Sequence, residues 1–139
     1  MTEEQIKKFA EERRNYQGFT GWCGISFEEI SRGLCRTVCD ITEHHLNPWG
    51  VAHGGVPFTM MDTAAGVAAQ TTGPDGKASV TQSADIHFLR PIFPGRVTAE
   101  ARVLKAGRNT ALVTVDLTDS SGTLLNRGEF EIFYVDRKK

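Results

Sequence analysis

The sequence predicts an α+β domain in which a mainly antiparallel sheet of five to six strands wraps one long central helix. Residues 54–70 predict the helix, because GGVPFTMMDTAAGVAAQ is apolar in every direction around a helical axis, as a buried helix requires. The last third of the chain predicts the sheet, because apolar and polar residues alternate there with the period of half-buried strands.

Length and charge limit the class of protein. We expect one domain over residues 1–139, with an N-terminal helix in residues 1–16 and a core over residues 20–136. The 16 Lys and Arg residues nearly balance the 17 Asp and Glu residues, which argues against a nucleic-acid partner. The mixed-charge start carries no secretory signal, and no apolar run is long enough to span a membrane. These features predict a soluble, cytoplasmic protein.

The first elements are an amphipathic helix and two strands. Apolar residues at helical spacing among charges predict a helix over residues 3–14. Strands are expected over residues 21–30 and 34–42, joined by a short turn. The long helix follows, and Gly-Pro-Asp-Gly at residues 73–76 predicts a loop after it.

A strand over residues 80–89 comes after this loop, and two prolines end it. Simple alternation places four apolar side chains on one face of this strand: Val80, Ala84, Ile86 and Phe88.

Three more strands are expected over residues 97–103, 111–118 and 124–135, connected by two tight hairpins. The final strand is apolar on both faces toward its end, so we expect packing on both sides there. A sheet of this size leaves an apolar edge beside the helix, and this predicts oligomerisation.

The cysteines predict buried thiols without a metal. Cys23, Cys35 and Cys39 form an odd set without C-x-x-C spacing, which argues against disulfides. Cys35 and Cys39 share one strand face but lie roughly 13 Å apart, too far to hold one ion together with His44 and His45. We therefore expect small buried hydrophobes, no metal site and no cofactor.

Asp62 is the one charged residue within residues 54–70. An ionised carboxylate costs several kcal/mol to desolvate unless partners hold it, so a lone one in an apolar helix indicates chemistry. The alternative is an aspartate on a helix surface that faces water. The apolar residues around it favour the buried interpretation.

The loop before the helix carries a specific motif. It reads N-P-W-G-V-A-H-G-G from Asn47 to Gly55, and Asp62 follows seven residues later. This pattern resembles the signature of hotdog-fold acyl-CoA thioesterases, and it is closest to the phenylacetate-pathway branch. The later F-L-R-P and G-R segments match that branch as well, and the resemblance covers roughly residues 20–135.

The resemblance implies a hotdog fold and hydrolysis of aryl- or medium-chain acyl-CoA thioesters to free acid and CoA. It also implies a homodimer or homotetramer whose active sites form at the dimer interface. Within one chain Gly54 and Asp62 lie roughly 12 Å apart along the helix axis, too far to act on one carbonyl group. A site built from two subunits removes this conflict.

Five residues are implied to be catalytic. Asp62 attacks the thioester or deprotonates a water, and the Gly54 backbone N–H at the helix N-terminus polarises the carbonyl. Asn47 and Thr81 orient the water, and His53 supports the loop by hydrogen bonds. From the residues alone, Asn47 is equally well a turn residue before a proline, and Thr81 an ordinary strand residue.

Substrate contacts are implied for five further residues. Arg90 in F-L-R-P and Arg108 in G-R match positions that meet the CoA phosphates, which suit guanidinium groups. Gly55, Phe58 and Met61 are expected to contact substrate. The weaker candidates for phosphate binding are Arg96, Lys105 and Arg127. The aromatic residues that could favour aryl groups, or fill the core, are Trp22, Phe27 and Trp49.

Two alternatives remain open from the sequence. One is a hotdog hydratase acting on enoyl thioesters, for which His53 paired with Asp62 supplies the acid–base groups. The other is a non-catalytic protein that binds acyl-CoA.

Overall fold

The computed structural model describes residues 1–137, and residues 138–139, which the expected domain includes, lie outside the described residues. The chain forms three helices, a short 3-10 turn and six strands. Their bounds are α1 (Glu3–Asn15), α2 (Phe19–Trp22), β1 (Ile25–Ser31), β2 (Leu34–Ile41), the turn Glu43–His45, α3 (Gly55–Gln70), β3 (Lys77–Phe88), β4 (Gly95–Ala106), β5 (Thr110–Asp119) and β6 (Leu124–Asp136).

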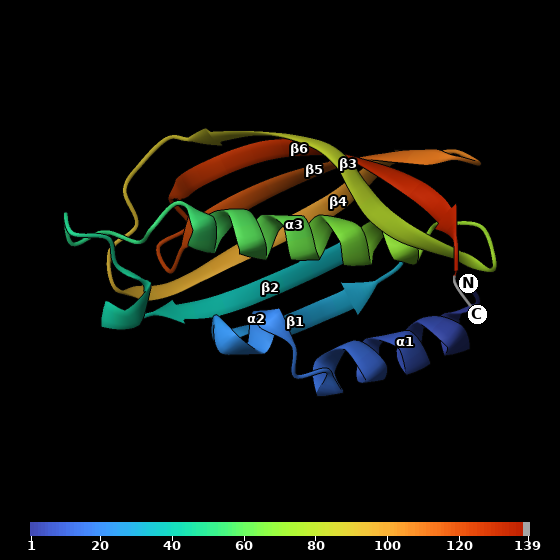
Figure 1. Ribbon diagram of the computed structural model, residues 1–139, viewed down its shortest axis with the longest axis horizontal. Coiled ribbons are helices and arrows are strands. Elements are labelled where there is room, and N and C mark those ends of the chain that lie inside the picture. The colour runs from blue at the N-terminus through green and yellow to red at the C-terminus, as the bar shows by residue number, and fades with distance from the viewer. Residues whose placement is uncertain (138–139) are drawn as a thin grey trace.

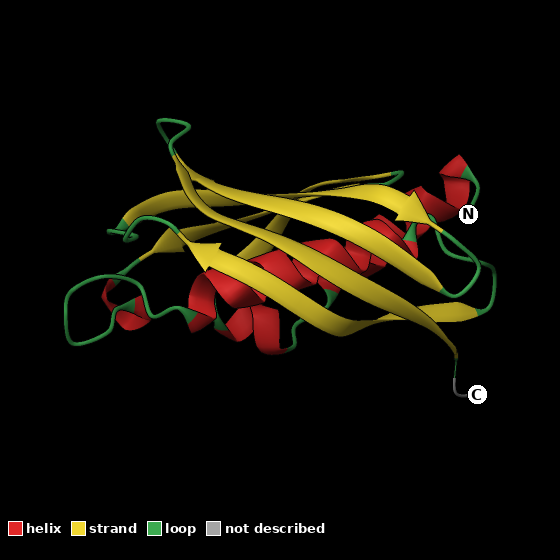
Figure 2. Cartoon of the chain, turned by 90° about the horizontal axis from the view of Figure 1, so that it is seen from above, coloured by secondary structure: helices red, strands yellow, loops and turns green. Residues whose placement is uncertain are grey.

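The six strands form one sheet in the order β1-β2-β4-β5-β6-β3, and every neighbouring pair is antiparallel. The sheet curves around α3, which lies along its concave face (Figure 1), and seen from above the strands cross over this helix (Figure 2). The predicted α+β fold, a long helix wrapped by an antiparallel sheet, is confirmed. β1 and β3 are the two edges of the sheet.

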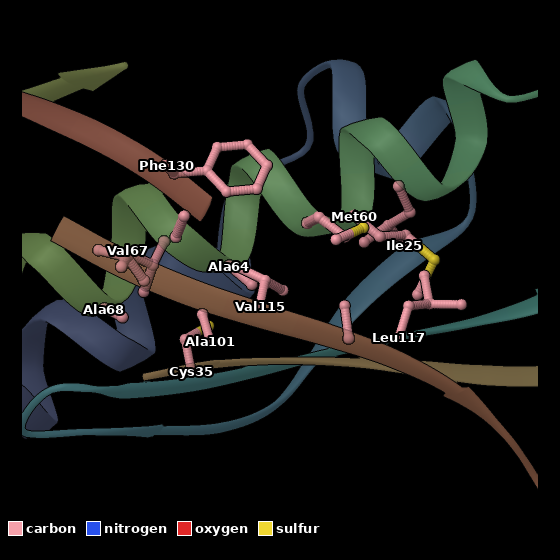
Figure 3. Packing of buried hydrophobic residues seen from close by; sticks show 14 of the residues in the cluster. Ile25, Cys35, Met60, Ala64, Val67, Ala68, Ala101, Val115, Leu117 and Phe130 are labelled. Atoms are coloured by element: carbon pink, nitrogen blue, oxygen red, sulfur yellow. The ribbon is translucent and has the colours of Figure 1, made fainter. Parts of the chain in front are cut away.

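The core lies between α3 and the inner face of the sheet. Alanines at Ala64, Ala65 and Ala68 have no exposed surface, and their small size lets the helix approach the strands closely. Inward residues of β5 and β6, such as Val115 and Phe130, fill the space around them (Figure 3). The alternation of the last strands therefore produces one buried face, as predicted.

The N-terminal helix is confirmed and extends one residue further than expected. Thr2 and Gln5 form a capping box at its start, and acidic residues in the first turn with basic ones in the last complement the helix dipole. Ile6 and Ala10 are buried. α1 packs beside β1 (Figure 1).

The strand expected over residues 21–30 is wrong in its first part. Residues Phe19–Trp22 form the short helix α2, and β1 begins only at Ile25. Gly24 between them has φ +72°, a left-handed conformation that interrupts an extended run and that glycine adopts without strain.

The face expected for β3 is also wrong at one residue. The register with β6 shifts between Thr81 and Ser83, which marks a bulge at Gln82. Ala84 pairs with the inward Phe130, but Val80 on the other side of the bulge pairs with the outward Phe133. Val80 therefore lies on the outer face, and Thr81 takes the inward position.

The end of β6 packs on one face only within the chain. Ile132 and Tyr134 point into the core and are at most 3% exposed, whereas Phe133 on the outer face is 40% exposed. The expected packing on both faces is therefore not found within a single chain.

The buried cysteines behave as small hydrophobes. No disulfide is formed by the three thiols, and burial raises the pKa of Cys35 to about 12 and that of Cys39 to about 11. Both groups stay protonated at neutral pH and are therefore poor nucleophiles. Among residues 1–137 no three His, Cys, Asp or Glu side chains gather as metal ligands would. No helix in the same part of the chain has the length and apolarity needed to cross a membrane.

The raised pKa of Cys35 predicts a loss of stability at alkaline pH. Above the ordinary thiol value of 9.0 the unfolded chain releases this proton while the folded chain retains it until about pH 12. The free energy of unfolding then falls by up to about 1.4 kcal/mol per pH unit from this thiol. Urea titrations between pH 8 and 10.5 should show a shallower fall for Cys35→Ala than for the wild type. Equal slopes would contradict this assignment, since Tyr134 and the other alkaline groups are common to both proteins.

Candidate active site

The loop that leads into α3 is organised by Asn47. Its side-chain oxygen accepts hydrogen bonds from the backbone N–H groups of Trp49 at 2.9 Å and Val51 at 3.4 Å. Gly50 at the tip has φ +83°. The interpretation of Asn47 as a turn residue is confirmed, and a role of its amide group toward water stays a prediction.

His53 holds the last turn of this loop. The Gly55 backbone N–H donates to His53 Nδ1 at 2.8 Å, and the His53 backbone N–H donates to the carbonyl oxygen of His45 at 2.8 Å. Nδ1 is therefore an acceptor, which places the proton of a neutral imidazole on Nε2. This geometry fits the expected supporting role of His53. His45 in turn bridges the Thr42 N–H and the carbonyl oxygen of Cys23.

Gly54 is the N-cap of α3, and no hydrogen bond among the described residues uses its backbone N–H. Gly55, by contrast, donates its N–H to His53. The Gly54 N–H is thus an available donor at the positive end of the helix dipole. A Cβ added at Gly54 would make ordinary van der Waals contact with the Phe88 ring at 3.4 Å.

Asp62 faces β3 rather than the core. The Thr81 hydroxyl donates to Asp62 Oδ1 at 2.6 Å. Asp62 is half-buried, and with Thr81, Thr63 and Gly66 it lines a cavity of about 540 Å³. The expectation that α3 is buried in every direction is wrong, because the sheet leaves this flank of the helix partly open.

The hydrogen bond of Asp62 belongs to a polar seam between α3 and β3. The Ser79 hydroxyl donates to the carbonyl oxygen of Gly66 at 2.7 Å. One turn further along, the Gln70 amide donates to the Lys77 carbonyl oxygen at 3.0 Å and accepts the Ser79 N–H at 2.8 Å. The contacts recur every four residues on α3 and every two residues on β3. Four helix residues rise about 6 Å and two strand residues about 6.6 Å, so the two spacings match.

The helix α1 closes the far side of the Asp62 cavity through Phe9, Glu12 and Arg13. The Arg13 guanidinium lies 5.4 Å from the Phe9 ring centroid and 5.7 Å from that of Tyr16. Nothing in the sequence connects these residues with Asp62, because only the fold places α1 against the end of β1 and the flank of α3.

The two arginines expected at the CoA phosphates lie at opposite ends of the sheet. Arg90 follows β3, donates from Nη1 to the carbonyl oxygen of Leu124 at 2.6 Å, and lines a recess that also contains Gly54. Arg108 lies in the β4–β5 hairpin. Phe88, two residues before Arg90, pairs with Asn126 of β6, and Thr110, two residues after Arg108, pairs with Phe133. Asn126 and Phe133 are seven residues apart on one strand, or about 23 Å, so one chain does not bring the two arginines together.

The weaker cationic candidates have other partners. Arg96 pairs with Asp40 at 3.0 Å and Arg127 with Asp116 at 2.7 Å, both on the outer face of the sheet. These carboxylates raise the pKa of both guanidinium groups. Lys105 is exposed at the end of β4.

Two residues expected at the acyl group differ in placement. Met61 has no exposed surface and belongs to the core, so the chain by itself offers no open surface of this residue to a substrate, and the expected contact stays a prediction. Phe58 is 41% exposed and packs edge-on against Phe130 with ring centroids 6.2 Å apart. The other aromatic candidates are Phe27, which packs against the core, and the exposed Trp22 and Trp49.

Asn126 is a candidate that the sequence analysis does not include. It lies on β6, is 1% exposed, and lines the same recess as Gly54 and Arg90. The alternation of β6 could have revealed Asn126, because it lies an even number of residues from the inward Phe130 and Ile132 and therefore on the same face. A polar residue at an inward strand position is unusual enough to mark a site.

Comparison with known proteins connects this arrangement with thioester hydrolysis. Residues 50–126 match the family model described as the thioesterase superfamily. The acyl-coenzyme A thioesterase PaaI of Escherichia coli is 31% identical over 97 residues, which cover 69% of this chain and 67% of that protein. A putative esterase of Saccharolobus solfataricus is 33% identical over 101 residues, 73% of this chain and 67% of the relative.

Solved structures show the same fold. The E. coli PaaI protein from the phenylacetic acid degradation operon superposes with a TM-score of 0.88 at 23% identity, covering 97% of this chain and 96% of that one. The protein smu.793 of Streptococcus mutans, solved with bound acetyl-CoA, has a TM-score of 0.75 at 25% identity, covering 83% and 91%. These matches confirm the hotdog fold, and the 31% identity to the thioesterase PaaI confirms the expected branch.

The hydrogen bond from Gly55 to His53 predicts a specific pattern of stability. His53→Ala leaves the Gly55 N–H without its acceptor and should lower the free energy of unfolding by about 1 kcal/mol. His53→Asn should retain most of it, because an asparagine oxygen can accept the N–H two residues further on. Chemical denaturation of the three proteins measures both effects. Equal losses in the two variants would show that the bond does not stabilise the loop.

Proposed function

The chain belongs to the thioesterase superfamily, and on this premise we propose that it hydrolyses aryl- or medium-chain acyl-CoA thioesters at a site shared by two subunits. Similarity to an acyl-coenzyme A thioesterase supports the substrate class, as does a structural neighbour solved with acetyl-CoA. The observation that carries the proposal is the Asp62 carboxylate, held by Thr81 at the wall of a cavity of about 540 Å³.

Asp62 and Thr81 are the reacting end of the proposed site. The Thr81 hydroxyl occupies one carboxylate oxygen, which fixes the orientation of the other toward the cavity. That oxygen either attacks the thioester carbon, giving a mixed anhydride that water hydrolyses, or removes a proton from the attacking water. Both routes release the acid and the CoA thiol, and both stay open here.

Gly54 supplies the electrophilic end. Its available N–H donates to the carbonyl oxygen, whose negative charge grows as the tetrahedral intermediate forms. The absence of a side chain lets the thioester approach, and His53 keeps the adjacent Gly55 N–H occupied, so the loop is held rigidly. One such backbone donor is worth on the order of 3 kcal/mol of transition-state stabilisation.

A second copy of the chain supplies the missing half of each site. β3 is an edge strand with an open row of backbone groups, and most of its side chains are exposed. Antiparallel pairing of two such edges would bring the Thr81 end of one strand toward the Phe88 end of the other. Because Phe88 contacts Gly54, this pairing puts Asp62 of one subunit near Gly54 of its partner. A dimer is the minimal active unit, and dimers can pair further into tetramers.

The hydratase alternative is less well supported by the geometry. A hydratase needs a histidine free to exchange protons, whereas His53 Nδ1 already accepts the Gly55 N–H. A non-catalytic binding protein is separated from an enzyme by the experiments below, because it would bind acyl-CoA without releasing thiol.

Asp62→Asn tests the reacting group. The change keeps the size of the side chain and removes its charge, so kcat should fall on the order of 10²–10⁴-fold. Free-thiol release from phenylacetyl-, hydroxybenzoyl- and octanoyl-CoA measures this and ranks the acyl groups in the wild type. Thermal unfolding provides the control, since the fold should persist. An Asp62→Asn protein that retains most of its activity would contradict the assignment.

Gly54→Pro tests the donor and the shared site together. Proline removes the N–H, and the Gly54 φ of −55° is one that proline adopts. Gly54→Ala adds a Cβ and keeps the donor, so it measures the effect of crowding at the thioester separately from the loss of the N–H. Gly54→Pro should lose most activity, and equal mixing with Asp62→Asn chains should restore about a quarter of it, since half of the dimers then hold one intact site. Absence of recovery in verified heterodimers would refute the cross-subunit site.

A further inference from the structure

Asn126 is a polar residue at an inward position of β6, and no other described residue forms a hydrogen bond with its side chain. It pairs with Phe88 of β3 on one side and with Leu117 of β5 on the other. The residue is 1% exposed. Neither its Nδ2 nor its Oδ1 has a hydrogen-bond partner among the described residues.

An amide in this state requires an explanation. Buried polar side chains are hydrogen-bonded in the large majority of cases, because desolvation without a partner is unfavourable. The nearby arginine Arg90 does not satisfy it, since the Arg90 Nη1 donates to the carbonyl oxygen of Leu124. The described residues thus supply no partner for Asn126, and a molecule from outside the chain can provide one.

Asn126, whose amide atoms are almost fully buried, lines a recess near the N-terminus of α3. The recess has a volume of about 270 Å³ and combines three polar groups with an otherwise apolar wall. The polar groups are the Gly54 backbone, the Asn126 amide and the Arg90 guanidinium. The remaining lining residues are Ala52, Pro57, Phe88, Pro91 and Ile92.

The three polar groups gather around Phe88 and the start of β6. Gly54 lies against the Phe88 ring, and Phe88 is the strand partner of Asn126. Arg90 is tied to Leu124, two residues before Asn126 on β6. Phe88 thus lies beside Gly54, pairs with Asn126 and precedes Arg90 by two residues, so the three polar groups surround one aromatic ring.

We propose that Asn126 recognises the amide of the pantetheine arm next to the thioester sulfur, through hydrogen bonds in both directions. This assignment rests on the proposed function. The Asn126 Oδ1 accepts the N–H of the pantetheine amide, and Nδ2 donates to its carbonyl oxygen. The thioester carbonyl, the adjacent amide and the CoA phosphates would then meet the three polar groups of one recess, Gly54, Asn126 and Arg90. A polar substituent on the acyl group is the competing partner.

Four thioesters of one acyl group separate these partners. The thiols are CoA, pantetheine, N-acetylcysteamine, which keeps only the amide next to sulfur, and butanethiol, which has no amide. Asn126→Leu replaces the amide by an apolar group of similar size. It should lower kcat/KM on the order of tenfold for the first three substrates and leave the butanethiol ester unchanged.

Other patterns overturn the proposal. An equal loss with all four substrates would assign Asn126 to the acyl side or to the structure alone. A loss limited to CoA and pantetheine would assign it to the more distant amide. No loss with any substrate would remove Asn126 from recognition. A wild type that hydrolyses none of the four esters would overturn the proposed function itself, and this assignment with it.

Stability measurements separate recognition from folding. Because Asn126→Leu removes two unpaired buried groups, its Tm should equal or exceed that of the wild type. Asn126→Ala, which cannot clash with its neighbours, should show the same substrate pattern if the leucine variant fails to fold. The exposed Asn15 at the end of α1 offers a matched control, and Asn15→Ala should behave as the wild type with every ester.

Discussion

The polar seam between α3 and β3 is the interaction on which the candidate site depends. A sheet of six strands covers the alanine-rich side of α3 but leaves the flank beside β3 without apolar cover. Hydrogen bonds take its place there, and they join Asp62, Gly66 and Gln70 to the inner residues of the edge strand. The same hydrogen bonds hold the edge strand β3 against α3 and orient the Asp62 carboxylate.

The bulge at Gln82 makes this seam compatible with the rest of β3. Before the bulge the inward residues are Ser79 and Thr81, which bond to the helix. After it the residues paired with the inward positions of β6 are Ala84, which stays exposed, and Ile86, which packs against the core. A strand without a bulge would turn Thr81 away from Asp62 whenever Ala84 faced the core. One extra residue therefore lets the same strand serve both the site and the core.

The two ends of the proposed site use different physical means. At the N-terminus of α3, His53 accepts the backbone N–H of Gly55, and the backbone N–H of Gly54 stays available as a donor. On the flank, a charged side chain is held by a hydroxyl group. Their separation along one helix is the reason for proposing that each chain contributes two half-sites, and that the open edge of β3 brings the halves of two chains together.

Sequence alone determined the fold class, the N-terminal helix, the long helix and the alternating strands, because these depend on local periodicity and capping. It also singled out Asp62, Gly54 and His53 as candidate site residues, since a lone charge and a glycine-rich loop stand out in any context. Only the tertiary structure decided the register of β3 and the placement of α1 beside Asp62. It also showed that Met61 is buried and Asn126 unpaired. These features depend on contacts between residues far apart in the chain, and no local pattern encodes which strand a bulge will shift or which side chain is left without a partner.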